Sequence, residues 1–231
     1  MKLEIGAEPD GPPSSLADRI ATLRRRIAEV AVQAGRSPDA IALVAVSKKQ
    51  SRERIIEALG AGLTDLGENY VREAREKLIG LPPVRTHFIG HIQSNKAKAI
   101  VETFDVVQSV DRIEAGRAIA KAARSLGKPV RALLQINISP LERFGIDPAA
   151  APALAARLRD EEDLDIAGIM AIGPNTSDRK TILRAFARAS ETFAAVGGDT
   201  LSIGMSGDWP EAITCGSTML RIGTAIFGAR A

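Results

Sequence analysis

The chain has 231 residues, of which 45% are hydrophobic and 26% charged, enough apolar material for one large α/β domain. A formal net charge of +3 with only 3% aromatic residues argues against a nucleic-acid partner, because few side chains could stack on bases. The single cysteine, Cys215, excludes an internal disulfide and is typical of a reducing compartment.

The N-terminal segment predicts neither export nor membrane insertion. Residues 1–14 are rich in Pro, Gly and Ser, so we expect a flexible tail there and a single domain over residues 15–231. The apolar stretch of a signal peptide is missing, and no apolar run approaches the roughly 20 residues of a membrane helix. We therefore expect a cytoplasmic protein with no membrane partner.

The predicted elements begin with an amphipathic helix. Apolar residues recur at spacings of three and four from Leu16 to Val30, and Gly35 is expected to end this helix in a left-handed conformation. Short apolar runs then alternate with helical segments. The predicted strands cover residues 41–47, 64–69, 86–90, 104–110, 130–139, 164–172, 201–206 and part of 219–228.

The helices between these strands carry recognisable end signals. Gly60, Gly80 and Gly127 are expected near helix ends. Asp111 with Glu114 three residues later predicts a capping box, and Asp147 followed by proline predicts another helix start. Strands that are apolar throughout and alternate with helices indicate parallel pairing. We predict an α/β fold, a single (βα)8 TIM-type barrel preceded by an extra N-terminal helix, with an open doubly wound sheet as the alternative.

Functional residues of such a barrel gather at the C-terminal ends of its strands. Lys48 follows the first strand, where apolar walls disfavour the ammonium form and favour a nucleophilic amine that can form a Schiff base. A solvated lysine at the strand exit is the alternative, since Lys49 lies beside it. The two histidines, His87 and His91, are predicted to be a core residue and a loop residue rather than a catalytic pair, and we expect no metal centre.

Glycine-rich segments follow the last two strands. GMSGD (204–208) and RIGT (221–224) offer small residues, hydroxyl groups and backbone N–H groups, and barrel proteins often bind phosphate at this corner. Two tight turns that need glycine for positive φ are the simpler interpretation. Because the first and last strands become neighbours on closure, a ligand with an aldehyde and a phosphate could bridge both features. Pyridoxal 5′-phosphate (PLP) has this shape.

Several motifs resemble those of one known family, the YggS/PROSC pyridoxal phosphate homeostasis proteins. The similarity runs from about residue 16 to the C-terminus in the same order. The motifs are LVAVSKKQ, LGENYVREAREK, HFIGHIQSNKAK, QSVDR, QINIS, GIMAI and LSIGMSGDWPEAITCGSTMLRIGTAIFGAR. The resemblance implies the barrel of the alanine racemase N-terminal domain, which is PLP fold type III, with PLP as cofactor.

The resemblance also implies roles for individual residues. Lys48 would form the internal aldimine, while Ser206, Gly223 and Thr224 would hold the phosphate. Arg221 matches an arginine that faces the cofactor, on either its pyridine nitrogen or its phosphate, and Asn69 would line the site near the ring. The predicted cofactor-binding residues are Lys48, Asn69, Met205, Ser206, Arg221, Gly223 and Thr224.

The resemblance and the residue content together suggest a binding protein. Related racemases carry a second domain with a tyrosine base, whereas this chain ends at Ala231 and its only tyrosine is Tyr70. We therefore expect a PLP carrier involved in vitamin B6 homeostasis, without substantial turnover, with PLP-dependent apo-enzymes as recipients and a monomeric state. The alternative is a single-domain PLP-dependent racemase or lyase that uses Lys48 as its base.

Overall fold

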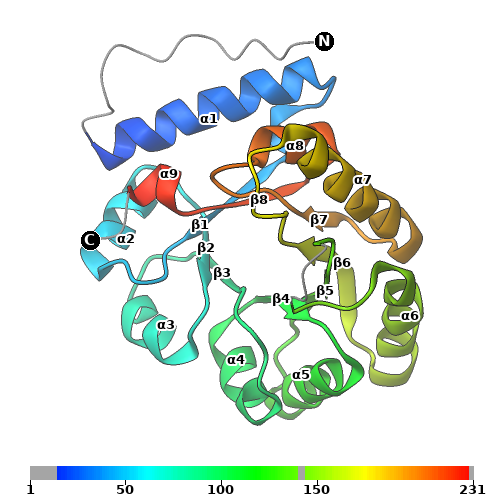
Figure 1. The fold of residues 1–231 in the computed structure, drawn as a ribbon. Helices are drawn as coiled ribbons and strands as arrows, with labels where there is room; N and C mark the ends of the chain where they lie inside the picture. The colour runs from blue at the N-terminus through cyan, green and yellow to red at the C-terminus, as the bar shows by residue number, and fades with distance from the viewer. Residues whose placement is uncertain (1–14, 140–143, 229–231) are drawn as a thin grey trace.

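A computed structural model describes residues 15–139 and 144–228. The expected tail at 1–14 lies outside the described residues. Eight parallel strands close into one barrel in sequence order, and β1 pairs with β8. Figure 1 shows the helices arranged around the outside of these strands. This confirms the predicted (βα)8 barrel, and the alternative of an open doubly wound sheet was wrong.

The strands are short and lie within, or one residue outside, the predicted segments. They are β1 Ala42–Val46, β2 Asp65–Glu68, β3 Arg85–Phe88, β4 Val106–Val110, β5 Arg131–Ile136, β6 Asp165–Ala171, β7 Thr200–Ser202 and β8 Met219–Ile222. The strand predicted within residues 219–228 ends at Ile222, and the later part of that segment forms a short helix.

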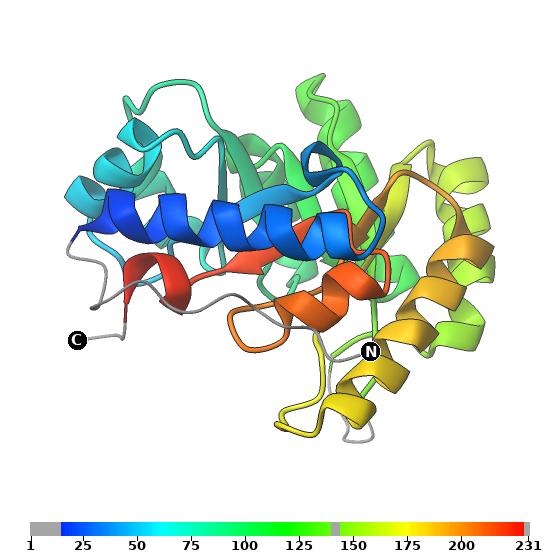
Figure 2. The same cartoon turned by 90° about the horizontal axis from the view of Figure 1, so that it is seen from above.

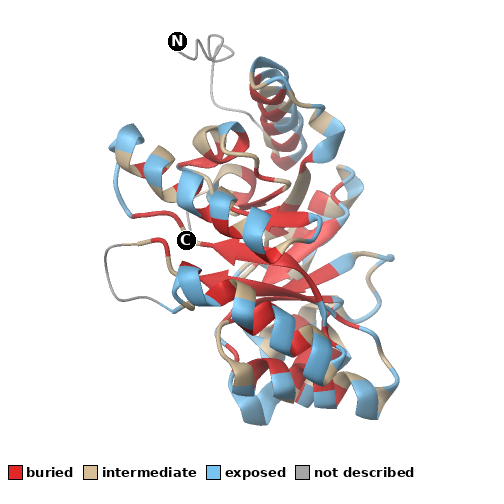
Figure 3. Ribbon diagram, turned by 90° about the vertical axis from the view of Figure 1, so that its right-hand side faces the viewer, coloured by how far each residue is buried: buried red, intermediate tan, exposed pale blue. Residues whose placement is uncertain are grey.

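The helices cover the outer face of the barrel. They are α1 Leu16–Gln33, α2 Arg52–Gly60, α3 Val71–Leu78, α4 Ala97–Thr103, α5 Ile113–Leu126, α6 Ala151–Glu162, α7 Arg179–Val196, α8 Trp209–Thr214 and α9 Thr224–Phe227. Short 3-10 turns precede β1, α4 and α6 at Pro38–Ala40, Ser94–Lys96 and Pro148–Ala150. In Figure 3 the strands are buried and the outward faces of the helices are exposed, so the main core lies between the two layers.

The extra N-terminal helix α1 is confirmed. Ser15 begins it with a capping box, in which the Ser15 hydroxyl accepts from the Asp18 N–H and Asp18 accepts from the Ser15 N–H. Gly35, at φ 70°, follows its C-terminal end as predicted. The helix packs beside α2, α8 and α9, as Figure 2 shows for α8 and α9, and so covers the seam where β1 meets β8.

The predicted capping box at the start of α5 was wrong. Arg112, not Asp111, is the residue that precedes the helix, and no side chain caps it. The Asp111 carboxylate instead accepts a hydrogen bond from Arg112 Nη1 at 2.6 Å. A guanidinium on the next residue therefore competes with the helix N–H groups for this carboxylate. The predicted start at Asp147 is confirmed, because its side chain accepts from the Ala149 N–H.

None of the helices within the described residues is long and apolar enough to cross a membrane.

Candidate functional site

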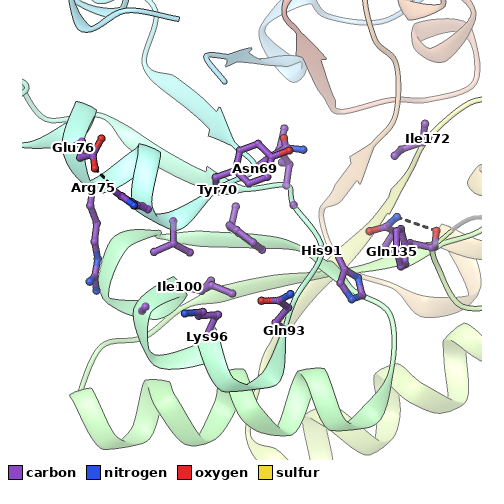
Figure 4. Close-up of a pocket in the computed structure, with 17 residues that line it drawn as sticks. Asn69, Tyr70, Arg75, Glu76, His91, Gln93, Lys96, Ile100, Gln135 and Ile172 are labelled. Atoms are coloured by element: carbon purple, nitrogen blue, oxygen red, sulfur yellow. Dashed lines mark hydrogen bonds and ion pairs between the residues drawn. The ribbon is translucent and has the colours of Figure 1, made fainter. Parts of the chain in front are cut away.

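A cavity of about 910 Å³ lies at the C-terminal end of the barrel. Asn69 after β2, Gln135 in β5 and Ile172 after β6 line its inner part, and it extends outward between α3 and α4 (Figure 4). Phe144 covers one side, where its ring stacks on His91 at a centroid distance of 4.3 Å and its carbonyl accepts from Gln135 Nε2. Function is expected at this end of the barrel, and the cavity opens there.

Lys48 lies in a tight turn directly after β1. The Ser47 carbonyl accepts a hydrogen bond from the Gln50 N–H at 3.0 Å, so Lys48 and Lys49 are the two central residues of the turn. Lys48 is half-buried, whereas Lys49 is exposed and has φ 61°, a left-handed conformation that lysine rarely adopts. The turn therefore presents the two adjacent lysines to different environments.

Asn69 lies at the barrel mouth in the loop after β2, which closely approaches the loop after β3. A Cβ on Gly90, after β3, would lie 2.1 Å from the Asn69 carbonyl oxygen, so only glycine fits at this position. Asn69 is half-buried, and its Oδ1 is a buried oxygen with no hydrogen-bond partner in the described structure. A buried orphan acceptor that lines a cavity suits a ligand with a donor group.

The loops after β7 and β8 meet at the same end of the barrel, on the other side of β1 from Asn69. The Ser206 hydroxyl accepts a hydrogen bond from the Ala225 N–H at 3.4 Å. This contact joins the two loops. Within the described ranges, no protein acceptor is recorded for the backbone N–H groups of Ser206, Gly207 and Thr224. The Met205 N–H is different, since it donates to Asp208 Oδ1 at 2.6 Å and helps to shape the loop. The corner therefore offers a hydroxyl and unbonded amides, as a phosphate requires.

Arg221 in β8 is buried, with 4% of its surface exposed. Its Nη1 donates to the Ser202 carbonyl at 2.6 Å and to the Ser202 hydroxyl at 2.7 Å, and its Nη2 donates to the Ala171 carbonyl at 2.9 Å. Burial lowers the pKa of Arg221 to about 10, with the nearby Asp208 carboxylate acting in the opposite direction. The guanidinium therefore stays charged at neutral pH.

Arg221 ends a hydrogen-bonded chain through the barrel interior. Ser202, which accepts from Arg221, donates to Gln108 Oε1 at 2.7 Å. Gln108 Nε2 lies 2.9 Å from His87 Nδ1, and His87 Nε2 lies 2.8 Å from Asp65 Oδ1. Because arginine only donates and a carboxylate only accepts, the consistent arrangement has the His87 proton on Nε2. His87 is thus a core residue, as predicted, and His91 lies in the loop after β3.

The structure brings the predicted site residues to one end of the barrel in two groups. One group follows β1 and β2, and the other follows β7 and β8. The ends of β1 and β8 are adjacent, since a Cβ on Gly223 would lie 3.5 Å from the Val46 carbonyl oxygen. Of the predicted residues, Asn69 alone lines the 910 Å³ cavity.

Sequence reasoning missed two sets of residues. The first is the interior chain from Asp65 to Ser202, which no motif signals because each residue lies alone in a different strand. The second is a cluster of Glu68, Glu73 and Lys77 beside the Lys48 turn. Here a signal was available, since Glu73 and Lys77 are four residues apart in a predicted helix.

Among residues 15–139 and 144–228, no group of three or more His, Cys, Asp or Glu side chains could hold a metal ion.

Taken together, the closed barrel, the lysine after β1 and the glycine-rich loops after β7 and β8 define a (βα)8-barrel protein with a small-molecule site at its mouth. A family model described as "Alanine racemase, N-terminal domain" matches residues 19–231. The chain is also 42% identical over 222 residues to a pyridoxal phosphate homeostasis protein of Pseudomonas aeruginosa, a match that covers 94% of this chain and 96% of the relative. It therefore belongs to the alanine racemase N-terminal domain family, among the relatives named pyridoxal phosphate homeostasis proteins.

Further relatives agree with this assignment. The homeostasis protein of Escherichia coli K12 is 38% identical over 231 residues, covering 94% of this chain and 97% of the relative. PipY of Synechococcus elongatus, solved with PLP bound, is 34% identical with a TM-score of 0.81, covering 93% of this chain and all of that one. Alanine racemase of Clostridium difficile has a TM-score of 0.68 at 15% identity, covering 90% of this chain and 56% of its own, so it shares the fold alone.

Proposed function

We propose that this protein binds PLP, with Lys48 as the covalent anchor and the loops after β7 and β8 as the phosphate site, and that it serves PLP homeostasis. The observation that carries the proposal is the adjacency of two features. Lys48 directly follows β1, while Ser206, Gly223 and Thr224 lie on loops after β7 and β8, and β8 pairs with β1. Such a site suits a compact ligand with an aldehyde and a phosphate.

The residues present fit this ligand. When bound, PLP supplies an aldehyde carbon for an amine and a phosphate for hydrogen-bond donors. The amine would come from Lys48, and the donors would be the Ser206 hydroxyl and the N–H groups of Ser206 and Thr224. Gly223 joins the two sides of the site, since a Cβ there would lie 3.5 Å from the Val46 carbonyl oxygen at the end of β1.

Three further residues have supporting roles in the proposal. Arg221 places a buried cation at the β8 end of the site, on the side where an anionic ligand would lie. Asn69 contributes its unpartnered Oδ1 at the β2 end. Met205 shapes the loop through its bond to Asp208 and leaves the Ser206 hydroxyl turned toward α9.

The relatives support the biological side of the proposal. Several proteins at 35–42% identity are named pyridoxal phosphate homeostasis proteins, and PipY was solved with PLP bound. We infer that this protein holds PLP in the cytoplasm as a monomer and delivers it to PLP-dependent apo-enzymes.

The test is the absorption spectrum of the purified protein after addition of PLP. We expect a band near ~420 nm, typical of PLP bound covalently to a lysine, in the wild type. The band should be absent in Lys48→Ala and Lys48→Arg, because both remove the reactive amine. Lys128→Ala, a change on the far side of the barrel, should keep it. A band that persists in both Lys48 variants would overturn Lys48 as the anchor.

The racemase or lyase alternative is supported by one observation, the position of Tyr70 in the cavity wall. A tyrosine in this wall could act as a second proton carrier beside Lys48. Incubation of the PLP-loaded protein with amino acids in D2O distinguishes the two functions. Steady incorporation of deuterium at Cα that Tyr70→Phe abolishes would establish catalysis, and no incorporation at saturating amino acid would favour the carrier.

A further inference from the structure

Three charged side chains meet behind the turn that carries Lys48. Lys77 Nζ lies 3.1 Å from Glu68 Oε1 and 2.5 Å from Glu73 Oε1. The cluster is largely shielded from solvent, with side-chain exposures of 1% for Glu68, 11% for Lys77 and 25% for Glu73. None of these residues has a part in the ligand contacts proposed above, so their role requires another explanation.

The cluster bonds the backbone on both sides of Lys48. Before it, Lys77 Nζ donates to the Ser47 carbonyl at 2.8 Å, and the Ser47 hydroxyl donates to Glu68 Oε1 at 2.7 Å. After it, the Lys49 N–H donates to Glu73 Oε1. The ammonium group of Lys77 has three N–H donors, and Ser47, Glu68 and Glu73 accept all of them. The neighbours of Lys48 are thus tied to β2 and α3.

The turn needs such support because its backbone is strained. Lys49 has φ 61°, and side chains with a Cβ rarely occupy this region unless their surroundings hold them there. The N–H that Glu73 accepts belongs to this strained residue. Loss of the bond would therefore release the turn toward other conformations and move the point from which the Lys48 side chain extends.

Burial of the cluster is costly, which argues that stability alone does not explain it. Glu68 Oε2 is a buried oxygen with no hydrogen-bond partner in the described structure, and burial raises the pKa of this carboxyl. For Glu73, burial also raises the pKa, but hydrogen bonds from Lys77 and the Lys49 N–H outweigh it and the net pKa is lowered. Buried ion pairs often contribute little net stability and are retained for a defined geometry.

We propose that Glu68, Glu73 and Lys77 are positioning residues for Lys48 and hold its turn in the conformation that presents the amine to the ligand. This inference rests on the proposed function in one respect, namely that Lys48 is the anchor for PLP. The geometry of the turn can be measured without any ligand, so the two proposals can fail separately.

The first experiment uses the protein without PLP and measures hydrogen exchange of the Lys49 amide by NMR. In Glu73→Ala we expect exchange at least about tenfold faster than in the wild type, because the amide loses its acceptor. Glu73→Gln keeps an acceptor oxygen and should restore slow exchange. Glu57→Ala, an exposed glutamate on α2, is the matched control. Equal exchange in the wild type and Glu73→Ala would overturn the inference.

The second experiment adds PLP to the same four proteins. In Glu73→Ala we expect the ~420 nm band to form with roughly tenfold weaker affinity and with a smaller induced circular dichroism per bound cofactor. Glu73→Gln and Glu57→Ala should match the wild type. A lower melting temperature with unchanged affinity and dichroism would indicate a purely structural role and overturn the inference. A wild type without a band would overturn the proposed function, while the exchange experiment would still decide the role of Glu73.

Discussion

The two sides of the proposed site are built from different interactions. Beside β1 and β2, charged side chains bond to one another, and Lys77 lies between two carboxylates. Beside β7 and β8, the charged Arg221 is bonded only to the carbonyls of Ala171 and Ser202 and to the Ser202 hydroxyl. No ion pair to Arg221 is recorded in the described part of the chain.

This difference indicates different tasks. Around Lys77, the charged side chains bond to one another and to the backbone beside Lys48, so they fix the shape of the turn. Arg221 makes no recorded ion pair, although the Asp208 carboxylate lies near enough to act on its charge, and its Nε–H and one Nη2–H have no recorded acceptor within the described ranges. An anionic ligand gains most from such a cation. One side therefore positions the amine, and the other binds charge.

The largest effect should follow from removal of the charge on the β8 side. In Arg221→Met we expect PLP affinity to fall roughly ten- to hundredfold, because charge-assisted hydrogen bonds to the ligand are lost. The fold should survive, since methionine fills much of the same volume and removes the cost of a buried cation. Titration of the ~420 nm band measures the affinity.

A remote arginine provides the control for this variant. Arg131 lies at the start of β5, at the other end of the barrel, where it pairs with Asp165 and Asp199. Arg131→Met should leave PLP affinity unchanged. If Arg221→Met also bound PLP with wild-type affinity, Arg221 would belong to the barrel interior and not to the ligand site.

The sequence predicted the barrel well because its signals are local. Apolar runs rich in β-branched residues, such as residues 41–47 and 130–139, favour buried strands, and glycines such as Gly35 and Gly127 end helices through their own backbone freedom. The failed capping box at Asp111 shows the limit of such signals. The Asp111 carboxylate accepts from the charged side chain of Arg112, and no side chain caps the helix N–H groups.

The site was only partly predictable. Lys48 and the glycine-rich loops could be found because strand ends are visible in the sequence. The chain from Asp65 through His87 and Gln108 to Ser202 could not, because its strands of three to five residues show too little alternation to reveal which side chains face inward. Its members are adjacent only after the barrel closes. The roles assigned to Lys48, Ser206 and Arg221 stay predictions until the ligand experiments are done.

A smaller effect is the pH dependence of stability that Glu68 gives to the β1 and β2 side of the site. Its pKa is raised by burial, so the folded protein binds this proton more tightly than the unfolded chain. The protonated Glu68 carboxyl stabilises the fold. This contribution is fully present below the pKa that Glu68 has in the unfolded chain, and it is lost as pH rises through the higher pKa that Glu68 has in the folded protein. We expect the free energy of unfolding of the wild type, relative to Glu68→Gln, to fall as pH rises above 4.5, the ordinary pKa of this carboxyl, by at most ~1.4 kcal/mol per pH unit.

Urea unfolding at several pH values measures this effect, and Asp199 supplies a control of opposite sign. Hydrogen bonding from Thr200 and pairing with Arg131 lower the pKa of Asp199, so its contribution is present above the unfolded pKa and is lost as pH falls. The difference between the wild type and Asp199→Asn should stay constant from pH 5 to 8. If the difference in the free energy of unfolding between the wild type and Glu68→Gln were also constant, the pKa of Glu68 would not be raised.

The smallest effect comes from the strained residue of the turn. Lys49→Gly should raise the free energy of unfolding by about 0.5–1 kcal/mol, because glycine adopts φ 61° without the strain of a Cβ, although it also makes the unfolded chain more flexible. Urea unfolding measures the gain. The Lys49 N–H that bonds to Glu73 is kept, so the turn itself should remain.

Asp163 supplies a control that shows whether backbone strain affects PLP binding only beside Lys48. It is the other described non-glycine residue with positive φ, at 51°, and it ends α6 far from the Lys48 turn. Asp163→Gly should stabilise the fold to a similar small extent and leave PLP affinity unchanged. Lys49→Gly should stabilise the fold but weaken PLP binding slightly, because a glycine beside Lys48 gives the turn more freedom before the ligand arrives. If the two variants behaved alike toward PLP, the Glu73 bond alone would be sufficient to hold the turn, and the lysine at position 49 would have no part in presenting Lys48.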